Sequence, residues 1–117
     1  MLRILSTSYN DTLLRAREWI LEREGYDVFS AMGFDEAREA CSQAGFQLLI
    51  MGHSIPKADK EHLIACFRAS NPYAPVVALI RAGEPRLPGV DTYVHPGDPD
   101  ALTHILRTIL TGIRPLK

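Results

Sequence analysis

A short stretch at the centre of the chain decides the fold: LLIMGHSIP, residues 48–56. Its first four residues are all apolar, which is typical of a strand that is covered on both faces of a parallel sheet. Gly52 and Pro56 then interrupt the run, so the chain turns there. A strand that ends in such a turn usually presents a functional side chain at the edge of the sheet, but Gly52 has no side chain to present.

Short apolar runs alternate with helical patterns on both sides of this stretch. We predict strands at 2–8, 26–31, 47–51, 74–80 and 91–95, and helices at 11–25, 35–44, 58–70 and from 99 onwards. Asn10 or Asp11 can cap the first helix, and Asp98 can cap the last. The last segment repeats apolar residues at helical spacing, namely Leu102, Ile105, Leu106, Ile109 and Ile113. Five strands that alternate with helices predict an α/β fold, a three-layer, doubly wound parallel sheet.

Composition indicates one globular domain. The chain has 117 residues, 46% of them hydrophobic and 23% charged, which suffices for one sizeable core. A net charge of −1 argues against nucleic acid as a main partner. No apolar run approaches the ~20 residues of a membrane span, and we expect no signal peptide. Cys41 and Cys66 form no CxxC motif and are interpreted as free thiols, so we expect a cytoplasmic protein.

Three segments carry a resemblance to a known family: ILSTSYNDTLLRAREWILEREGYDV (4–28), FQLLIMGHSIPKADKEHLIACFR (46–68) and YVHPGDPDAL (93–102). They resemble the first strand and helix, the third strand with its loop and helix, and the last strand and helix of a response-regulator receiver domain. The resemblance covers nearly the whole chain, 1–117, as one domain. It implies the flavodoxin-like strand order 2-1-3-4-5 and a signalling role of the two-component, phosphorelay type.

The residues that carry the chemistry of that family are absent. Receivers hold Mg²⁺ with an acidic pair, and the matching positions here are Ser8 and Tyr9. The phosphoacceptor aspartate is matched by Gly52, the hydroxyl residue of the fourth strand by Ile80, and the lysine of the fifth strand by His95. Magnesium requires carboxylate oxygens, and phosphoryl transfer depends on neutralising charge. The resemblance therefore implies a pseudo-receiver that is not an enzyme, holds neither Mg²⁺ nor another cofactor, and works without phosphorylation.

Further departures concern the last two strands. Residues 81–90, RAGEPRLPGV, contain two prolines and two glycines, so we expect the family's fourth helix to be shortened or lost. The place of the family's switch aromatic falls on Thr92, which leaves Tyr93 out of phase and on the opposite face. From the resemblance we also expect a cis peptide bond between His95 and Pro96.

Several functions are compatible with such a sheet edge. The preferred hypothesis is a module that acts through contacts with a protein partner or as a homodimer, with no nucleic acid and no membrane involved. Alternatively, a pocket formed by Ser8, Gly52, His53 and His95 binds a small ligand or anion. A small hydrolase with Ser8 as nucleophile is the least favoured hypothesis. A serine nucleophile needs an activating base, and His95 is the only candidate in reach. Two histidines without a carboxylate or thiolate are a weak metal signal, so we predict no metal site.

Apolar residues on the first and last helices exceed what one core-facing stripe requires, namely Trp19, Ile20, Ile109, Leu110 and Ile113. They either contact a partner or bridge neighbouring helices. The sequence leaves both interpretations open.

Overall fold

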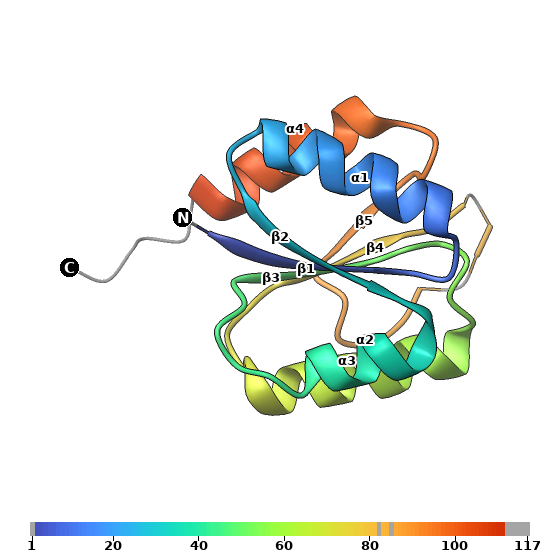
Figure 1. The fold of residues 1–117 in the computed structure, drawn as a ribbon. Helices are drawn as coiled ribbons and strands as arrows, with labels where there is room; N and C mark the ends of the chain where they lie inside the picture. Colours follow the sequence, from blue (N-terminus) through green and yellow to red (C-terminus); the bar gives the residue numbers. More distant parts are fainter. Residues whose placement is uncertain (1, 82, 85, 112–117) are drawn as a thin grey trace.

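The computed structural model describes residues 2–81, 83–84 and 86–111, along which strands and helices alternate (Figure 1). The elements are β1 (Arg3–Ser8), α1 (Asp11–Arg23), β2 (Asp27–Met32), α2 (Gly33–Cys41), β3 (Leu48–Met51), α3 (Lys57–Ser70), β4 (Val76–Leu79), β5 (Thr92–Val94) and α4 (Pro99–Thr111). The predicted helices and strands are confirmed, and their ends differ by at most three residues. Helix α2 starts two residues before the predicted position, and Met32, the residue that precedes it, donates its N–H to Glu36 Oε1 at 3.1 Å.

The five strands form one parallel sheet in the order β2-β1-β3-β4-β5, as expected. Helices α1 and α4 cover one face of this sheet, and α2 and α3 cover the other (Figure 1). The fold is therefore the three-layer, doubly wound arrangement. Because all strands run in the same direction, their carboxyl ends meet at one edge.

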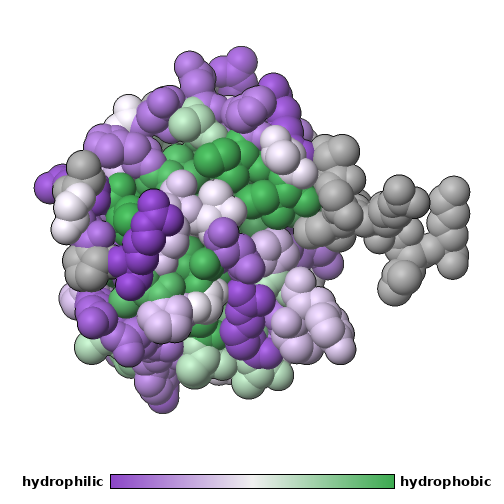
Figure 2. Space-filling view, turned by 180° about the vertical axis from the view of Figure 1, so that it is seen from behind, coloured by the Kyte–Doolittle hydropathy of each residue, from purple (hydrophilic) through white to green (hydrophobic). Residues whose placement is uncertain are grey.

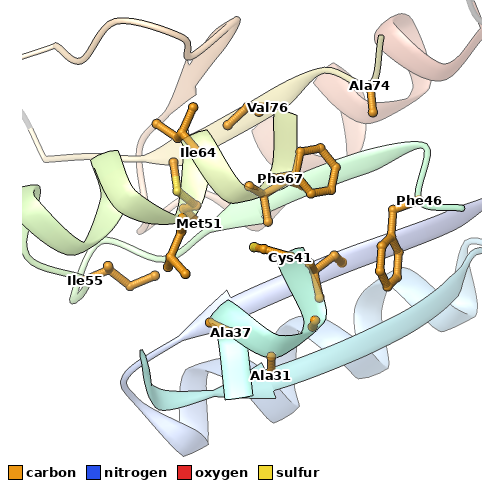
Figure 3. Packing of buried hydrophobic residues seen from close by; sticks show 14 of the residues in the cluster. Ala31, Ala37, Cys41, Phe46, Met51, Ile55, Ile64, Phe67, Ala74 and Val76 are labelled. Atoms are coloured by element: carbon orange, nitrogen blue, oxygen red, sulfur yellow. The ribbon is translucent and has the colours of Figure 1, made fainter. Parts of the chain in front are cut away.

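Strand β3 is buried on both faces, as its unbroken apolar run predicts. Leu49 and Met51 belong to the core cluster under α2 and α3, which also contains Phe67 (Figure 3). Leu48 and Ile50 belong to the opposite cluster, which α1 and α4 complete. All four β3 side chains have 0% exposure. Because burial of one such side chain contributes about 1.5–3 kcal/mol, this strand anchors both halves of the core.

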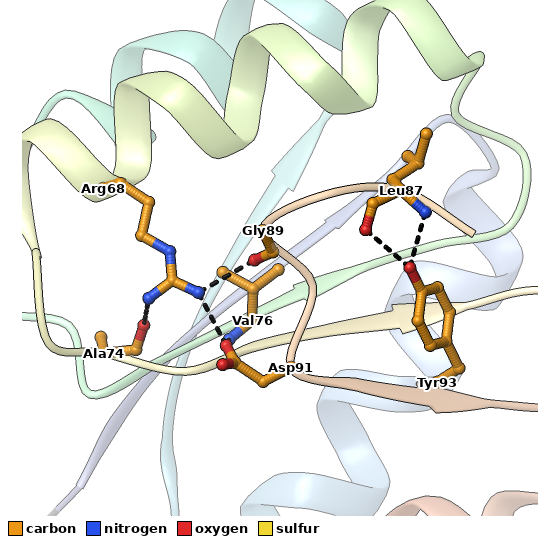
Figure 4. A network of polar contacts seen from close by, with 7 residues as sticks. All are labelled: Arg68, Ala74, Val76, Leu87, Gly89, Asp91 and Tyr93. Atoms are coloured by element: carbon orange, nitrogen blue, oxygen red, sulfur yellow. Dashed lines mark hydrogen bonds and ion pairs between the residues drawn. The ribbon is translucent and has the colours of Figure 1, made fainter.

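The connection between β4 and β5 contains no helix in its described residues, in agreement with the predicted loss of the fourth helix. Polar contacts hold it in place instead (Figure 4). Arg68 of α3 donates to the Gly89 carbonyl at 2.9 Å and to Asp91 Oδ2 at 2.7 Å. The Tyr93 hydroxyl donates to the Leu87 carbonyl at 2.8 Å and accepts from the Leu87 N–H at 2.6 Å.

Tyr93 has a structural role in this arrangement. It packs against the cluster under α2 and α3, so Thr92, its neighbour on β5, faces the other side of the sheet. The structure shows that Thr92 and Tyr93 face opposite sides of the sheet, and the difference in phase from the switch aromatic of receivers stays a prediction. With its hydroxyl group both donating to and accepting from Leu87, Tyr93 fastens the connection that stands in place of a helix.

The turn after β5 corrects one prediction. None of the described residues has a cis peptide bond, so the expected cis bond between His95 and Pro96 is wrong. The trans chain turns because the Gly97 N–H donates to His95 Nδ1 at 3.0 Å and the Asp98 N–H donates to the His95 carbonyl at 3.3 Å. Asp98 then caps α4 by accepting from the Ala101 N–H at 3.0 Å, as predicted.

Other predictions concern the first cap, the cysteines and the helices. Asn10 caps α1 through Oδ1, which accepts from the Leu13 N–H at 3.0 Å, and Cys41 and Cys66 are both free. No helix in the described part of the chain is long and apolar enough to cross a membrane. The predicted position of Ile113 on the last helix lies outside the described residues.

Candidate functional site at the carboxyl edge of the sheet

The carboxyl edge of the sheet gathers the residues that the resemblance singles out. Ser8 is the last residue of β1. Gly52, Ile80 and His95 directly follow β3, β4 and β5. The Gly52 N–H donates to the Thr7 carbonyl at 2.9 Å, and a Cβ on Gly52 would lie 3.2 Å from Ser8 Oγ. The residues matched to the acidic pair and to the phosphoacceptor are therefore neighbours.

Ser8 and Tyr9 are both engaged in local contacts. Ser8 Oγ accepts from the Asn10 N–H at 3.0 Å and donates to the Asn10 carbonyl at 3.2 Å, and the side chain is buried. The Tyr9 hydroxyl donates to Asp59 Oδ2 on α3 at 2.7 Å. Burial, and then this bond to Asp59, raise the pKa of Tyr9 above its ordinary value, so the hydroxyl stays neutral. Both positions thus present neutral oxygens that already have partners.

Arg17 of α1 lies against this site. Its Nη1 donates to Ser6 Oγ at 2.9 Å and to the Thr7 carbonyl at 3.2 Å. Its Nη2 is 3.2 Å from the point that a Cβ on Gly52 would occupy. The side chain is only 6% exposed, and burial lowers its pKa to about 10, which still leaves the guanidinium charged at neutral pH.

No carboxylate pairs with Arg17 in the described part of the chain. The ion pairs there join Asp or Glu to other arginines, namely Arg3, Arg15, Arg68 and Arg107. Burial is the cause of the lowered pKa of Arg17, with no neighbouring charge to oppose it. A buried cation without a counter-charge is expensive, so its presence at this edge requires a physical reason.

A sequence signal for Arg17 did exist. The buried residues of α1 are Leu14, Arg17 and Leu21, which recur at the spacing of one helix face. A charged residue on the apolar stripe of a helix is unusual, because buried charges normally have partners. Arg17 lies outside the positions at which receivers carry catalytic groups, so the resemblance does not single it out.

The donor groups at this edge do not fit magnesium. Ser8 and Tyr9 supply neutral hydroxyls that are bonded elsewhere, Gly52 supplies no side chain, and a buried guanidinium lies beside them. Among the described residues no three His, Cys, Asp or Glu side chains are grouped so that they could hold a metal ion. Mg²⁺ needs carboxylate oxygens in octahedral geometry, and this arrangement offers a cation in their place.

The neighbouring side chains are of mixed charge: Asp59 bonds to Tyr9, and Glu84 lies close enough to His53 and Lys60 to oppose the lowering of their pKa values. His53 Nε2 lies 3.3 Å from Arg81 Nη2. Burial, and then the charge of Arg81, lower the pKa of His53, so its ring is neutral at pH 7 and accepts from Arg81. Lys60 of α3 is also buried, and burial lowers its pKa as well. Ile80 packs against the core cluster under α2 and α3 and offers no hydroxyl.

A cavity of about 210 Å³ opens beside Arg17, between α1 and α4 and above the ends of β4 and β5. His53 and His95 line it together with Arg17, whereas Ser8 and Gly52 do not. The four residues of the predicted ligand pocket therefore divide into two pairs, and Arg17 contacts both spaces. The rest of the lining is mostly apolar: Leu13, Ala16, Ile20, Leu79, Pro96, Asp98 and Leu102.

Ser8 and His95 form no nucleophile–base pair in this structure. Ser8 Oγ is bonded to the backbone of Asn10, and His95 Nδ1 accepts from the Gly97 N–H. Ser8 is also only 1% exposed, so a substrate could not approach its hydroxyl without rearrangement. The geometry gives the hydrolase hypothesis no support.

Comparison with known proteins identifies the fold. No protein-family model matches the sequence, and no curated protein matches it. A two-component response regulator from Clostridium difficile superposes with a TM-score of 0.80 at 19% identity, covering 95% of this chain and 97% of that one. The response regulator TrrA from Thermotoga maritima, in complex with Mg²⁺-BeF, gives 0.79 at 20% identity, with 93% and 99% covered. TrrA in complex with the histidine kinase ThkA gives 0.76 at 21% identity, with 94% and 99% covered. The chain is thus closely similar in structure to receiver domains, although its sequence identity to them is low.

Proposed function

We propose that this chain is a receiver-like signalling module that works without phosphorylation and acts through contacts with another protein. The observation that carries the proposal is the buried guanidinium of Arg17 against Gly52, at the position matched to a phosphoacceptor. The acceptor oxygen is missing, and a buried positive charge lies directly beside the matched position. Restoring one residue would therefore not restore the reaction.

Electrostatics alone disfavour a metal at this edge. A doubly charged ion about 5 Å from the Arg17 charge would be repelled by ~7 kcal/mol at an effective dielectric constant of about 20. The neutral oxygens of Ser8 and Tyr9 cannot offset such a repulsion. Phosphoryl transfer relies on a metal to neutralise the developing charge, so loss of the metal removes the main source of catalysis.

Surface features support a role in protein contacts. On α1, Trp19 is 61% exposed and Leu13 is 41% exposed, and the Arg23 guanidinium lies 4.6 Å from the centre of the Trp19 ring. Exposed Trp and Arg side chains often dominate binding energy at protein interfaces. TrrA, which has the same fold, binds a histidine kinase, so a protein partner is a reasonable expectation for this chain too.

A second surface is available for a homodimer. Figure 2 shows apolar side chains exposed on the face behind that of Figure 1, including the area over α4. Ile105 and Ile109 of α4 are partly exposed while packing on the core cluster under α1 and α4. Either surface could serve a module that signals by association.

The test of phosphorylation independence is intact-protein mass spectrometry after incubation with acetyl phosphate and Mg²⁺. We expect an unchanged mass, with an active receiver domain as positive control. A metal-dependent species heavier by one phosphoryl group would refute the proposal.

Partner contact is tested separately with a photo-crosslinking residue at position 19, expressed in the native host. A discrete crosslinked protein is expected from position 19. The matched control is position 12, because Thr12 is exposed on the same helix. Equal crosslinking from both positions would argue against a specific surface around Trp19.

A further inference from the structure

Some N–H donors of the Arg17 guanidinium have no acceptor among the described residues. An arginine side chain carries five N–H donors. Nη1 uses its own on Ser6 Oγ and the Thr7 carbonyl, while Nε and Nη2 have no acceptor in the described residues. The same side chain lines the cavity between α1 and α4 while being only 6% exposed. An anion in the cavity would supply the counter-charge that the protein does not provide.

The walls of the cavity define the rest of such a ligand. Apart from Arg17, the lining is largely hydrocarbon, with Leu13, Ile20, Leu79 and Leu102 as its larger side chains. A volume of about 210 Å³ has room for roughly seven water molecules. It therefore suits a molecule of about five to eight non-hydrogen atoms that has one charged end and an apolar body.

The polar groups favour a single negative charge over two. Asp98 also lines the cavity, and its carboxylate would repel a dianion such as hydrogen phosphate. His53 is neutral at pH 7, because burial and Arg81 lower its pKa. His53 Nε2 accepts from Arg81, so its Nδ1 carries the proton. His95 Nδ1 accepts from the Gly97 N–H, so its Nε2 carries the proton. Both imidazoles thus retain one N–H donor for a carboxylate oxygen.

We propose that this cavity binds a small aliphatic monocarboxylate, whose carboxylate pairs with Arg17 and whose apolar body lies between α1 and α4. This inference does not depend on the proposed function, because it concerns the side chains of the cavity and not the phosphorylation chemistry. It gives the module a chemical input: occupancy would fill the space between the two helices that carry its exposed apolar residues.

The test is an NMR titration of the full-length, ¹⁵N-labelled protein with sodium isovalerate at constant ionic strength. The backbone amides of Gly52, His53 and His95 should shift together in a saturable way, with a dissociation constant in the millimolar range. Isovaleramide, which has the same shape without the charge, should bind at least tenfold more weakly. Inorganic phosphate should not displace isovalerate.

Four variants complete the test. Arg17→Met should weaken isovalerate binding at least tenfold, while Arg15→Met, on the exposed side of α1 and paired with Asp11, should leave it unchanged. Ala16→Phe, at an exposed position of the lining, should fill the cavity and abolish binding without touching the guanidinium. Asp98→Asn keeps a helix cap and should strengthen binding severalfold. Equal binding of acid and amide, unchanged binding by Arg17→Met, or tighter binding of phosphate than of isovalerate would each overturn the proposal.

Discussion

Replacing Gly52 with aspartate should create an ion pair with Arg17 rather than a phosphoacceptor. A Cβ at position 52 would lie 3.2 Å from Arg17 Nη2, from Ser8 Oγ and from the Thr7 carbonyl oxygen. The guanidinium is the far end of a flexible side chain and can shift by a few tenths of an ångström. The new carboxylate would then meet the unused donors of Arg17 at hydrogen-bond distance.

The expected magnitude follows from this geometry. Opposite charges about 4 Å apart attract by ~4 kcal/mol at an effective dielectric constant of about 20, and charge-assisted hydrogen bonds measured by mutation contribute about 1.5–3 kcal/mol. Crowding around the new Cβ should cost about 1–2 kcal/mol, because the Thr7 carbonyl belongs to the backbone and cannot move aside as the guanidinium can. We therefore expect a coupling energy between the introduced carboxylate and Arg17 of about 3 kcal/mol, and a net gain of about 1–2 kcal/mol over the wild type.

The assay is a double-mutant cycle from urea unfolding at pH 7, with wild type, Gly52→Asp, Arg17→Met and the double variant. Gly52→Ala is the matched control, since it introduces the crowding without the charge. An aspartate held in an ion pair has a folded-state pKa below its ordinary value of about 3.9, so the stabilisation should be present above about pH 4 and disappear as the pH falls further. A coupling energy below about 0.5 kcal/mol, or phosphorylation of Gly52→Asp by acetyl phosphate, would refute the reasoning.

Three other predictions concern Arg17 and the polar contacts of the connection between β4 and β5. Arg17→Met should change the free energy of unfolding by less than about 1 kcal/mol at pH 7, because relief of the buried charge offsets two lost hydrogen bonds. Above pH 10 the wild type should gain stability relative to this variant. The reason is that the folded-state pKa of Arg17, about 10, lies below its unfolded value, so the unfolded chain then binds more protons. A difference between the two proteins that falls with pH in that range would contradict this. Tyr93→Phe leaves the Leu87 N–H without its partner and should cost about 1–2 kcal/mol by thermal or urea unfolding, whereas Tyr73→Phe, at a residue that is 97% exposed, should cost nothing measurable. Asp91→Ala removes the acceptor of both Arg68 and the buried Val76 N–H and should lower the free energy of unfolding by about 2 kcal/mol. The control Asp11→Ala, in an exposed ion pair, should lower it by less than about 1 kcal/mol. Equal losses would show that the loop contacts do not stabilise the connection between β4 and β5.

Much of the fold could be predicted from local patterns. The run LLIM is apolar at every position because β3 is covered on both faces, and the prolines and glycines of residues 81–90 exclude a helix for steric reasons. The turn at His95 was predicted less well. The cis bond was inferred from the resemblance alone, and the hydrogen bonds that actually form this turn depend on the His95 side chain.

The site was only half predictable. Strand ends place Ser8, Gly52 and His95 at one edge, because parallel strands must align there. The charge at that edge depends on Arg17, which belongs to helix α1 and contacts the end of β1 with its long side chain. Contacts of this kind depend on rotamers and on tertiary packing, which motif matching does not describe. The partner, the loss of Mg²⁺ and the ligand stay predictions.

We propose that the buried Arg17 cation at the carboxyl edge of this sheet excludes magnesium and a phosphoryl group. The most direct measurement is a crystal structure after soaking with magnesium chloride and beryllofluoride, the combination that TrrA holds. We expect no bound metal or fluoride beside Gly52, and Arg17 Nη1 still bonded to Ser6 Oγ and the Thr7 carbonyl. Magnesium and beryllofluoride bound at Gly52, with Arg17 displaced, would contradict it.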